Sequence, residues 1–260
     1  MRVFHGFDDL PRFVRPVVTV GSYDGVHTGH RKLIGEVVRM ARSGGGESVV
    51  VTFWPHPRTV LAGCGKGEKP VELLSMPGEK AFLLASLGVD NLIVAPFTKD
   101  FSRLSPADFV RGYLVNRIGV DHLVVGFNHH FGRNHEGGLG DLVKLGAECG
   151  FALTQISEQD VGRSKVSSTI VRDLIRRGEM TDAAGLLGAP YIIMWPPGEG
   201  KLLPPPGNYP VRVGRDGGHC KAVLSISLEN APALIRPSTA ELVPNSSDAQ
   251  EGRMIIEFMQ

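Results

Sequence analysis

Hydrophobic and polar positions along residues 17–156 form two alternating patterns. One consists of short apolar or β-branched runs without polar alternation, which are typical of strands buried on both faces. Such runs lie at residues 17–20, 48–53, 91–95, 122–126 and 151–156. Between them apolar residues recur at helical spacing, at residues 31–40, 79–87, 106–118 and 139–149. The alternation predicts an α/β fold with a parallel sheet and helices on both of its faces.

Local signals mark the ends of two of these helices. Ser105 is a suitable N-cap, and Pro106 follows it at the first helical position. Gly150 stands directly after the pattern of residues 139–149 and is expected to end that helix.

The pattern changes near residue 190. Seven prolines crowd residues 190–210 together with several glycines, which disfavours helices. Strand-like runs lie at residues 209–213, 222–228 and 254–258. These features predict a small C-terminal β region, so we expect residues 1–188 and 189–260 to form two domains.

Composition narrows the class of protein. Hydrophobic residues make up 42% and charged residues 21% of the 260 positions, as in an ordinary globular protein. The net charge of +1 argues against a nucleic-acid partner, because general nucleic-acid binders carry a basic surplus. Three scattered cysteines do not suit a disulfide framework and favour a reducing, cytoplasmic location. We expect neither a signal peptide nor a membrane span, since the apolar stretches are too short.

The first candidate site is the glycine-rich segment 21–30, which joins the strand at 17–20 to a helix. Unpaired N–H groups and the positive end of the helix dipole suit a phosphate at such a place. His27 and His30 are spaced so that both can point at one anion. A zinc site is a poorer interpretation, because no cysteine pair lies near. Two exposed loop histidines are the other alternative.

The segment 52–58 follows the second strand at the same edge of the predicted sheet. Pro55 and Pro57 stiffen it, while an aromatic residue, His56 and Arg58 are presented for contact. It is interpreted either as a rigid wall for a planar or phosphorylated ligand or as a plain turn.

The segment 126–138 follows the fourth strand and contains glycines, an amide, histidines and an arginine. Asn128 can both donate and accept hydrogen bonds to a ligand. Metal binding by the histidines of this loop is conceivable, but adjacent histidines do not converge easily on one ion. These histidines are His129, His130 and His135.

The segment 163–172 places hydroxyl groups at the start of a helix, followed one turn later by Arg172. The hydroxyl residues are Ser167, Ser168 and Thr169. Hydroxyls, free N–H groups and a guanidinium form a second cradle for a polyphosphate. Ordinary N-capping is the alternative, and it explains one hydroxyl better than the whole cluster.

Two phosphate cradles with a stiff loop between them suit nucleotidyl transfer, in which the protein accelerates the reaction mainly by holding the two substrates in position. A bound phosphate would attack the α-phosphate of ATP, and histidines and arginine would stabilise the charge on the oxygens. No resident metal site is expected, since Mg²⁺ would arrive with ATP and be held largely by the substrate phosphates.

Together these segments resemble the bacterial FAD synthetase family, whose members usually combine riboflavin kinase and FMN adenylyltransferase activities. Residues 21–30 resemble G-x-F-D-G-x-H-x-G-H with Tyr23 for Phe, and residues 52–57 resemble T-F-x-P-H-P. Residues 126–132 resemble G-x-D/N-F-x-F-G with His129 for an aromatic, and residues 166–172 resemble I-S-S-T-x-I-R. The four motifs stand in the family's order and span roughly residues 15–190.

The resemblance implies a Rossmann-like nucleotidyltransferase domain that converts FMN and ATP into FAD and pyrophosphate. It implies catalytic roles for His27, His30, Asn128 and Arg172. It implies ATP contacts from Gly21, Ser22, Asp24, Gly29, Ser167, Ser168 and Thr169. It implies FMN contacts from Phe53, Pro55, His56, Pro57 and Asn128.

The C-terminal region departs from the family. The motif G-F-P-T-A-N of the family's kinase barrel is missing from this sequence, although residues 202–213 resemble the barrel's L-P-x-x-G-x-Y-x-V-x-V. We therefore expect residues 189–260 to be a shortened barrel without riboflavin kinase activity. Two other functions stay open: a nucleotidyltransferase for a different acceptor, and a flavin- or nucleotide-binding regulator without catalysis.

Overall fold

The computed structural model describes residues 1–62, 71–127, 132–133, 136–157, 166–215, 218–227, 232–235 and 254–259. These residues form two compact units, and segments of the chain cross between them. The first unit comprises Met1–Tyr23, Gly29–Val71 and Ala81–Lys165, and the second comprises Asp24–Thr28, Glu72–Lys80 and Val166–Gln260.

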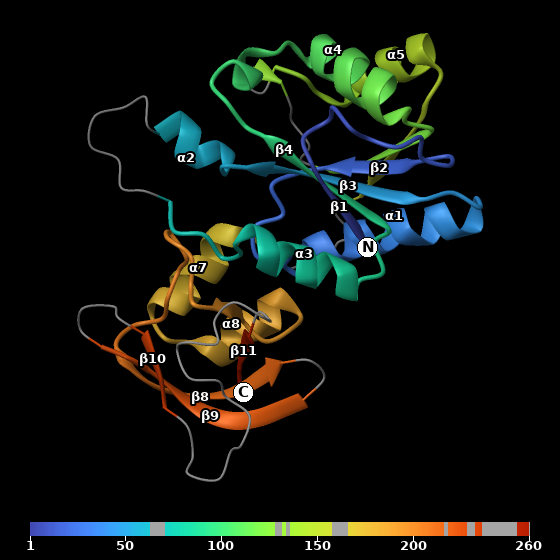
Figure 1. Cartoon of the computed structure of the whole chain (residues 1–260). Helices are drawn as coiled ribbons and strands as arrows, with labels where there is room; N and C mark the ends of the chain where they lie inside the picture. The colour runs from blue at the N-terminus through green and yellow to red at the C-terminus, as the bar shows by residue number, and fades with distance from the viewer. Residues whose placement is uncertain are drawn as a thin grey trace. The chain divides into compact units, whose positions relative to one another are not determined.

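The first unit contains a parallel sheet of six strands in the order β1-β4-β3-β2-β5-β6. Figure 1 labels β1, β2, β3 and β4 of this sheet. Its strands are β1 (Arg2–His5), β2 (Val17–Val20), β3 (Ser48–Trp54), β4 (Asn91–Pro96), β5 (His122–Gly126) and β6 (Ala152–Ile156). The register places Val17 opposite Ser48 on one side and opposite His122 on the other. The predicted α/β fold with a parallel sheet is confirmed.

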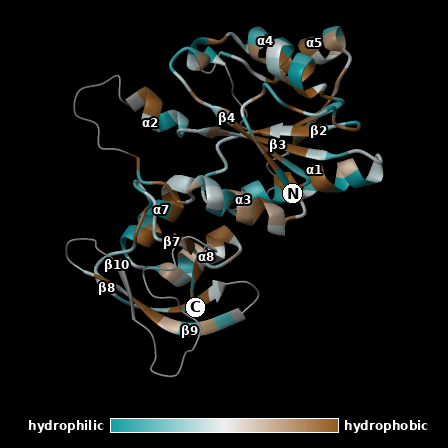
Figure 2. Cartoon of the chain, viewed as in Figure 1, coloured by the Kyte–Doolittle hydropathy of each residue, from teal (hydrophilic) through white to brown (hydrophobic). Residues whose placement is uncertain are grey.

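Helices cover both faces of this sheet (Figure 1). The helices of this part of the chain are α1 (Thr28–Ser43), α2 (Pro57–Ala62), α3 (Pro77–Ser86), α4 (Pro106–Phe109) and α5 (Leu139–Cys149), with the short η1 (Phe101–Arg103) and the π-helix η2 (Val110–Ile118). Val18 and Val20 pack in one cluster with the buried side chains of α4, η2 and α5. The strands are coloured mostly as hydrophobic in Figure 2, as expected for a sheet buried on two sides.

The helix-end signals are confirmed. The Ser105 hydroxyl accepts a hydrogen bond from the N–H of Asp108, and Gly150 adopts a left-handed conformation with φ 81°. The helix expected over residues 106–118 is continuous but changes its hydrogen bonding to the π type at Val110.

The sequence pattern missed β1, α2 and the short η1 of the first unit. β1 is short and mostly exposed, so it lacks the apolar run that marks the other strands. α2 begins within the segment 52–58, which the sequence analysis interpreted as a loop because it contains two prolines. Proline is tolerated in the first turn of a helix, and Pro57 is the first residue of α2.

The second unit combines two helices with an antiparallel sheet of five strands in the order β10-β9-β8-β11-β7. Its elements are α7 (Ser168–Arg176), α8 (Met180–Leu187), β7 (Ile192–Trp195), β8 (Gly207–Arg215), β9 (Gly218–Ile226), β10 (Pro232–Ile235) and β11 (Met254–Phe258). Three of these five strands were expected; β7, which prolines flank closely, and the four-residue β10 were missed. Val171 and Ile175 of α7 pack against the sheet's apolar side chains in one core.

Helices long and apolar enough to cross a membrane were sought in the part of the chain that the structure describes, and none was found. The domain boundary between residues 188 and 189 stays a prediction. It was drawn between an expected adenylyltransferase region and an expected kinase-like region, and not between compact units of the structure.

Candidate active site

The turn after β2 has an unusual backbone. Tyr23, Gly25 and Val26 all have positive φ, with values of 47°, 80° and 44°. Glycine adopts such angles freely, but a β-branched residue does so rarely and with strain. A side chain at Gly25 would also approach the Leu74 Cδ1 atom to 2.8 Å. Strained backbone that the surroundings hold in place is typical of functional sites.

Tyr23 fixes the part of the turn that belongs to the first unit. Thr19 Oγ1 donates to the Val124 carbonyl at 2.8 Å, so the Tyr23 hydroxyl donates to Thr19 Oγ1 at 2.7 Å. Burial raises the pKa of Tyr23 above its usual value, so the hydroxyl stays neutral. The Tyr23 ring meets the His30 ring edge to face, with centroids 5.2 Å apart. Tyr23 therefore borders one of the two predicted catalytic histidines.

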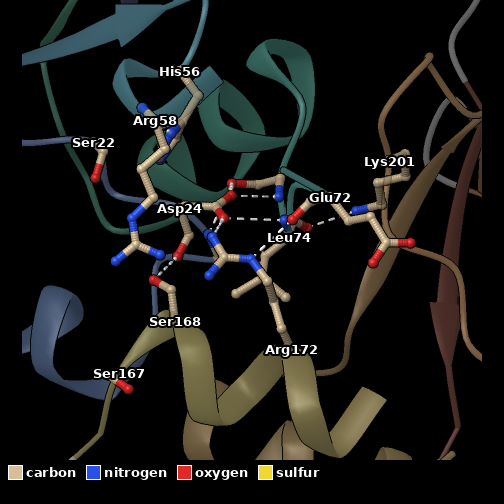
Figure 3. Close-up of polar contacts among 12 residues, drawn as sticks. Ser22, Asp24, His56, Arg58, Glu72, Leu74, Ser167, Ser168, Arg172 and Lys201 are labelled. Carbon is tan, nitrogen blue, oxygen red and sulfur yellow. Dashed lines mark hydrogen bonds and ion pairs between the residues drawn. The ribbon is translucent and has the colours of Figure 1, made fainter. Parts of the chain in front are cut away.

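The Asp24 carboxylate is the centre of a buried polar cluster in the second unit (Figure 3). Its Oδ1 accepts hydrogen bonds from Ser75 N at 2.9 Å and from Ser75 Oγ at 3.3 Å. Its Oδ2 accepts from Leu74 N at 3.2 Å and from Arg172 Nη2 at 2.5 Å. The side chains of Arg172 and Asp24 are 6% and 2% exposed, so they form a buried ion pair.

The N-terminus of α7 is tied to the same turn (Figure 3). Ser168 Oγ donates to the Asp24 carbonyl at 2.9 Å, and Arg172 Nε donates to the Glu72 carbonyl at 2.8 Å. Ser167 accepts from the N–H of Ile170 and caps the helix, as the alternative interpretation predicted for one hydroxyl. The two segments predicted to cradle phosphates are therefore joined directly, although 144 residues separate Asp24 from Ser168.

His27 lies in the same unit and is buried. Burial lowers its pKa from 6.5 to about 4, and this outweighs the opposing effects of its backbone hydrogen bond and of Asp24. The imidazole is therefore neutral at pH 7. It can donate a hydrogen bond to a phosphate oxygen from one ring nitrogen, but it carries no full positive charge at this pH.

The lowered pKa of His27 makes the stability of the protein depend on pH. The unfolded chain binds this proton below pH 6.5, whereas the folded chain binds it only near pH 4, so stability falls as the pH decreases through this window. We expect His27 to lower the free energy of unfolding by about 2 kcal/mol between pH 7 and pH 5. Urea unfolding of the wild type and of His27→Gln at both pH values measures this difference.

The exposed His5 supplies the matched control, His5→Gln. The control is expected to keep the wild-type loss of stability on acidification, whereas His27→Gln reduces that loss. Equal losses in all three proteins would contradict a buried, neutral His27.

The other predicted residues of the first unit line the strand ends. Thr52 Oγ1 donates to the Ser22 carbonyl at 3.1 Å, which holds the start of the turn against β3. His56 Nδ1 accepts from the N–H of Arg58 at 3.2 Å, and the His56 ring is buried. Phe53 packs among aromatic rings, with its centroid 5.5 Å from that of Phe97.

The remaining predicted residues differ in exposure. Pro55 and Thr169 are exposed, while Gly21, Gly29 and Pro57 are partly buried. Asn128, a predicted catalytic and FMN-binding residue, lies outside the described residues. The same is true of the loop histidines His129, His130 and His135.

The segment Glu72–Lys80 is a part of the cluster that the sequence interpretation missed. It supplies the two N–H groups and the hydroxyl that hold Asp24, and Ser75 Oγ also accepts from Gly25 N at 2.9 Å. One signal was available: Glu79 stands at the third position of a helix that begins with Pro77, where a carboxylate caps the helix start.

In this geometry Asp24 has a structural role, and other groups of the candidate site are suited to bind a phosphate. Asp24 accepts four hydrogen bonds and pairs with Arg172, so it shapes the turn and is not a free base or metal ligand. Within the second unit, the parts suited to meet a phosphate are the N–H groups of the turn and of α7, together with the His27 imidazole. Binding and transition-state stabilisation suit this arrangement better than covalent catalysis.

Comparison with known proteins agrees with this picture. A family model described as FAD synthetase matches residues 12–170. A bifunctional riboflavin kinase/FMN adenylyltransferase of Listeria monocytogenes is 40% identical over 178 residues, covering 68% of this chain and 55% of the relative. A protein of the same organism named FAD synthetase is 32% identical over 180 residues, covering 68% of this chain and 70% of the relative.

Two further similarities include the C-terminal region. A bifunctional riboflavin kinase/FMN adenylyltransferase of Buchnera aphidicola is 26% identical over 265 residues, covering 100% of this chain and 83% of the relative. A crystal structure titled macrolide-efflux protein, from Streptococcus pneumoniae, shares the fold with a TM-score of 0.78 and 21% identity, covering 99% of this chain and 89% of that one. The chain spans about half the length of the bifunctional relatives of Listeria monocytogenes and Bacillus subtilis, 55% of each.

Proposed function

The chain belongs to the FAD synthetase family, and from this we propose that it is an FMN adenylyltransferase. In the proposed reaction an FMN phosphate oxygen attacks the α-phosphorus of ATP. The bond to the attacking oxygen forms as the bond to the β-phosphate bridging oxygen breaks, so FAD and pyrophosphate leave without a covalent enzyme intermediate.

One observation carries the proposal: a hydrogen bond and an ion pair join Asp24 to α7 within the second unit. Ser168 donates to the Asp24 carbonyl, and Arg172 pairs with the Asp24 carboxylate. Both halves of a triphosphate site are thereby held in a fixed relation, and fixed positioning is what phosphoryl transfer requires most from a protein.

The chain's own residues would act mainly by hydrogen bonding. His27, neutral before substrate binds, would donate to a phosphate oxygen, and charge gathering on the phosphates would favour its protonation. His30 would stabilise the same developing charge, beside the ring of Tyr23. The exposed N-terminal turn of α7 would bind further oxygens through Thr169 and its N–H groups.

The oxygen atoms of the candidate site do not suit a divalent ion held by the protein. They suit better an ion that arrives bound to ATP. Asp24 is occupied by Arg172, Leu74 and Ser75 and offers no free oxygen pair. A magnesium ion bound to the triphosphate would neutralise part of the charge of the leaving pyrophosphate. We therefore propose Mg²⁺ as a companion of the substrate.

The acceptor side is proposed to involve the segment after β3. Phe53 lies in an aromatic cluster, and Pro55, His56 and Pro57 follow it in a stiff segment, which suits the planar isoalloxazine ring of FMN. Asn128 stays a prediction as an FMN and catalytic residue. A cytoplasmic location and the absence of a nucleic-acid partner also stay predictions from composition.

Product analysis by chromatography tests the proposed activity. The purified chain, incubated with Mg-ATP and FMN, is expected to form FAD and pyrophosphate in equal amounts. With Mg-ATP and riboflavin it is expected to form neither FMN nor FAD, because the proposed C-terminal region lacks kinase activity.

The two incubations separate the alternatives. FMN or FAD made from riboflavin would overturn the kinase-inactive interpretation of residues 189–260. Turnover of another phosphorylated acceptor in place of FMN would identify a different nucleotidyltransferase. Binding of FMN or ATP without any product would identify a regulator.

A further inference from the structure

Lys201 is a buried cation of the second unit, and its side chain is 0% exposed. Its ammonium donates to Glu79 Oε2 and to the Leu74 carbonyl, both at 2.7 Å, and to the Ile192 carbonyl at 2.8 Å. These bonds use all three ammonium protons. The Tyr191 ring centroid lies 4.3 Å from Nζ, close enough for a cation–π contact. Lys201 therefore acts on the protein itself and not on a ligand.

Glu79, the partner of Lys201, connects two parts of the unit. Its Oε2 also accepts from the N–H of Met76 at 2.8 Å, which caps the start of α3. Its Oε1 accepts from the N–H of Met194 in β7 at 2.8 Å. The carboxylate thus fastens the end of the segment Glu72–Lys80 to the antiparallel sheet.

The backbone of the same segment is fastened beside Lys201. Leu73 N donates to the Gly200 carbonyl at 2.8 Å, and Leu202 N donates to the Leu73 carbonyl at 2.9 Å. Figure 3 shows Lys201 reaching the Leu74 carbonyl, while the N–H of Leu74 points to Asp24. One face of this short segment binds the C-terminal region, and the other binds Asp24.

We propose that Lys201 is a positioning residue for adenylyl transfer, because it holds the segment Glu72–Lys80 in the place from which Leu74 and Ser75 grip the Asp24 carboxylate. The inference rests on the proposed function and gives the C-terminal region a role in that reaction. It concerns the triphosphate of ATP, since the Asp24 turn and α7 are the proposed phosphate-binding parts.

A single and a double variant can distinguish a positioning role of Lys201 from a purely stabilising one. Lys201→Met leaves Glu79 as an unpaired buried charge, so the melting temperature is expected to fall by roughly 10 °C. In the double variant Lys201→Met/Glu79→Gln no charge is left unpaired, and glutamine can still cap α3. The double variant is therefore expected to regain much of the thermal stability, but not the bond to the Leu74 carbonyl.

Steady-state kinetics with Mg-ATP and FMN then reports on the site. For the double variant we expect kcat/KM for ATP to fall by about 10²-fold, with little change in KM for FMN. Arg212→Met is the matched control, because it removes a half-exposed cation from β8 of the same sheet, where Arg212 lies 3.9 Å from Glu257. The control is expected to keep wild-type values for both substrates.

Amide hydrogen exchange gives a readout that needs no activity. The amides of Leu74 and Ser75 are expected to exchange faster in the double variant than in the control, while amides of the β8–β9 ladder keep their protection. Wild-type exchange of both amides, or equal changes in KM for ATP and FMN, would overturn the proposal. If the wild type made no FAD, the proposed function would fail, and exchange alone would still decide whether Lys201 positions the Asp24 turn.

Discussion

Replacing Arg172 with methionine is expected to destabilise the protein and to slow FAD formation strongly. The change leaves the Asp24 carboxylate buried, 2% exposed, without its cation. Breaking a buried ion pair by removing one partner lowers the free energy of unfolding by about 3–5 kcal/mol. Urea unfolding at pH 7 measures this loss.

The effect on activity has the same origin. Arg172 also donates to the Glu72 carbonyl, so its loss removes one of the two bonds between α7 and the Asp24 turn and a bond between α7 and the segment Glu72–Lys80. Displacement of a positioned group by about 1 Å can lower the rate by about 10²-fold. We expect kcat/KM for ATP to fall by at least this factor, measured at a temperature where the variant is folded.

Arg176→Met is the matched control, one turn along the same helix. Arg176 is 49% exposed and pairs with the Glu72 side chain at 2.7 Å in solvent. An exposed pair contributes about 0–1 kcal/mol, so this variant should unfold nearly as the wild type does and keep its activity. Equal losses in the two variants would show that the buried pair with Asp24 has no special role.

The second large effect is expected from His30→Ala. If His30 stabilises charge on the phosphates in the transition state, its removal lowers kcat by about 10²–10³-fold. The Tyr23 ring that borders His30 is held by Thr19 and stays in place, so the site should keep its shape. Rapid-quench turnover with FMN and ATP measures kcat, and calorimetry measures binding of each substrate.

Binding of FMN and ATP to His30→Ala should stay within a few-fold of the wild type, since the interaction is strongest in the transition state. His122→Ala is a suitable control. His122 is partly buried at the start of β5, where it shares a hydrogen bond with Thr154 at 2.8 Å, and it is expected to affect stability by about 1 kcal/mol. A His30→Ala enzyme with unchanged kcat would exclude His30 from the chemistry.

The sequence predicted the parallel sheet well because its strands are buried on both faces. Val17–Val20 and residues 48–53 are nearly all apolar or β-branched, as is typical of strands covered by helices on both faces. β1 pairs with β4 through its backbone while its side chains remain mostly exposed. Pairing of that kind leaves no hydrophobic signature, so composition could not reveal it.

Local patterns indicated the segments of the candidate site but not their contacts with one another. The glycine-rich turn at 21–30 and the helix start at 163–172, with Ser168 and Arg172, were recognisable locally as candidate phosphate cradles, whereas the role of Asp24 was implied only by the family resemblance. Their contacts with one another depend on tertiary packing. Lys201 and Glu79 had no local signal as a pair, since 122 residues separate them and each alone is an ordinary charged residue.

The strand order of the antiparallel sheet has a consequence for synthesis of the chain. β11 lies between β8 and β7, and Asp24–Thr28 belongs to the same compact unit. On the ribosome the six-stranded sheet can form once β6 has emerged, whereas the unit that contains Asp24 waits until residue 258 has been added. A polypeptide released before this point would contain the folded parallel sheet, but its segment Asp24–Thr28 would lack the rest of the second unit. Premature termination would therefore yield a folded first unit without the candidate phosphate-binding turn.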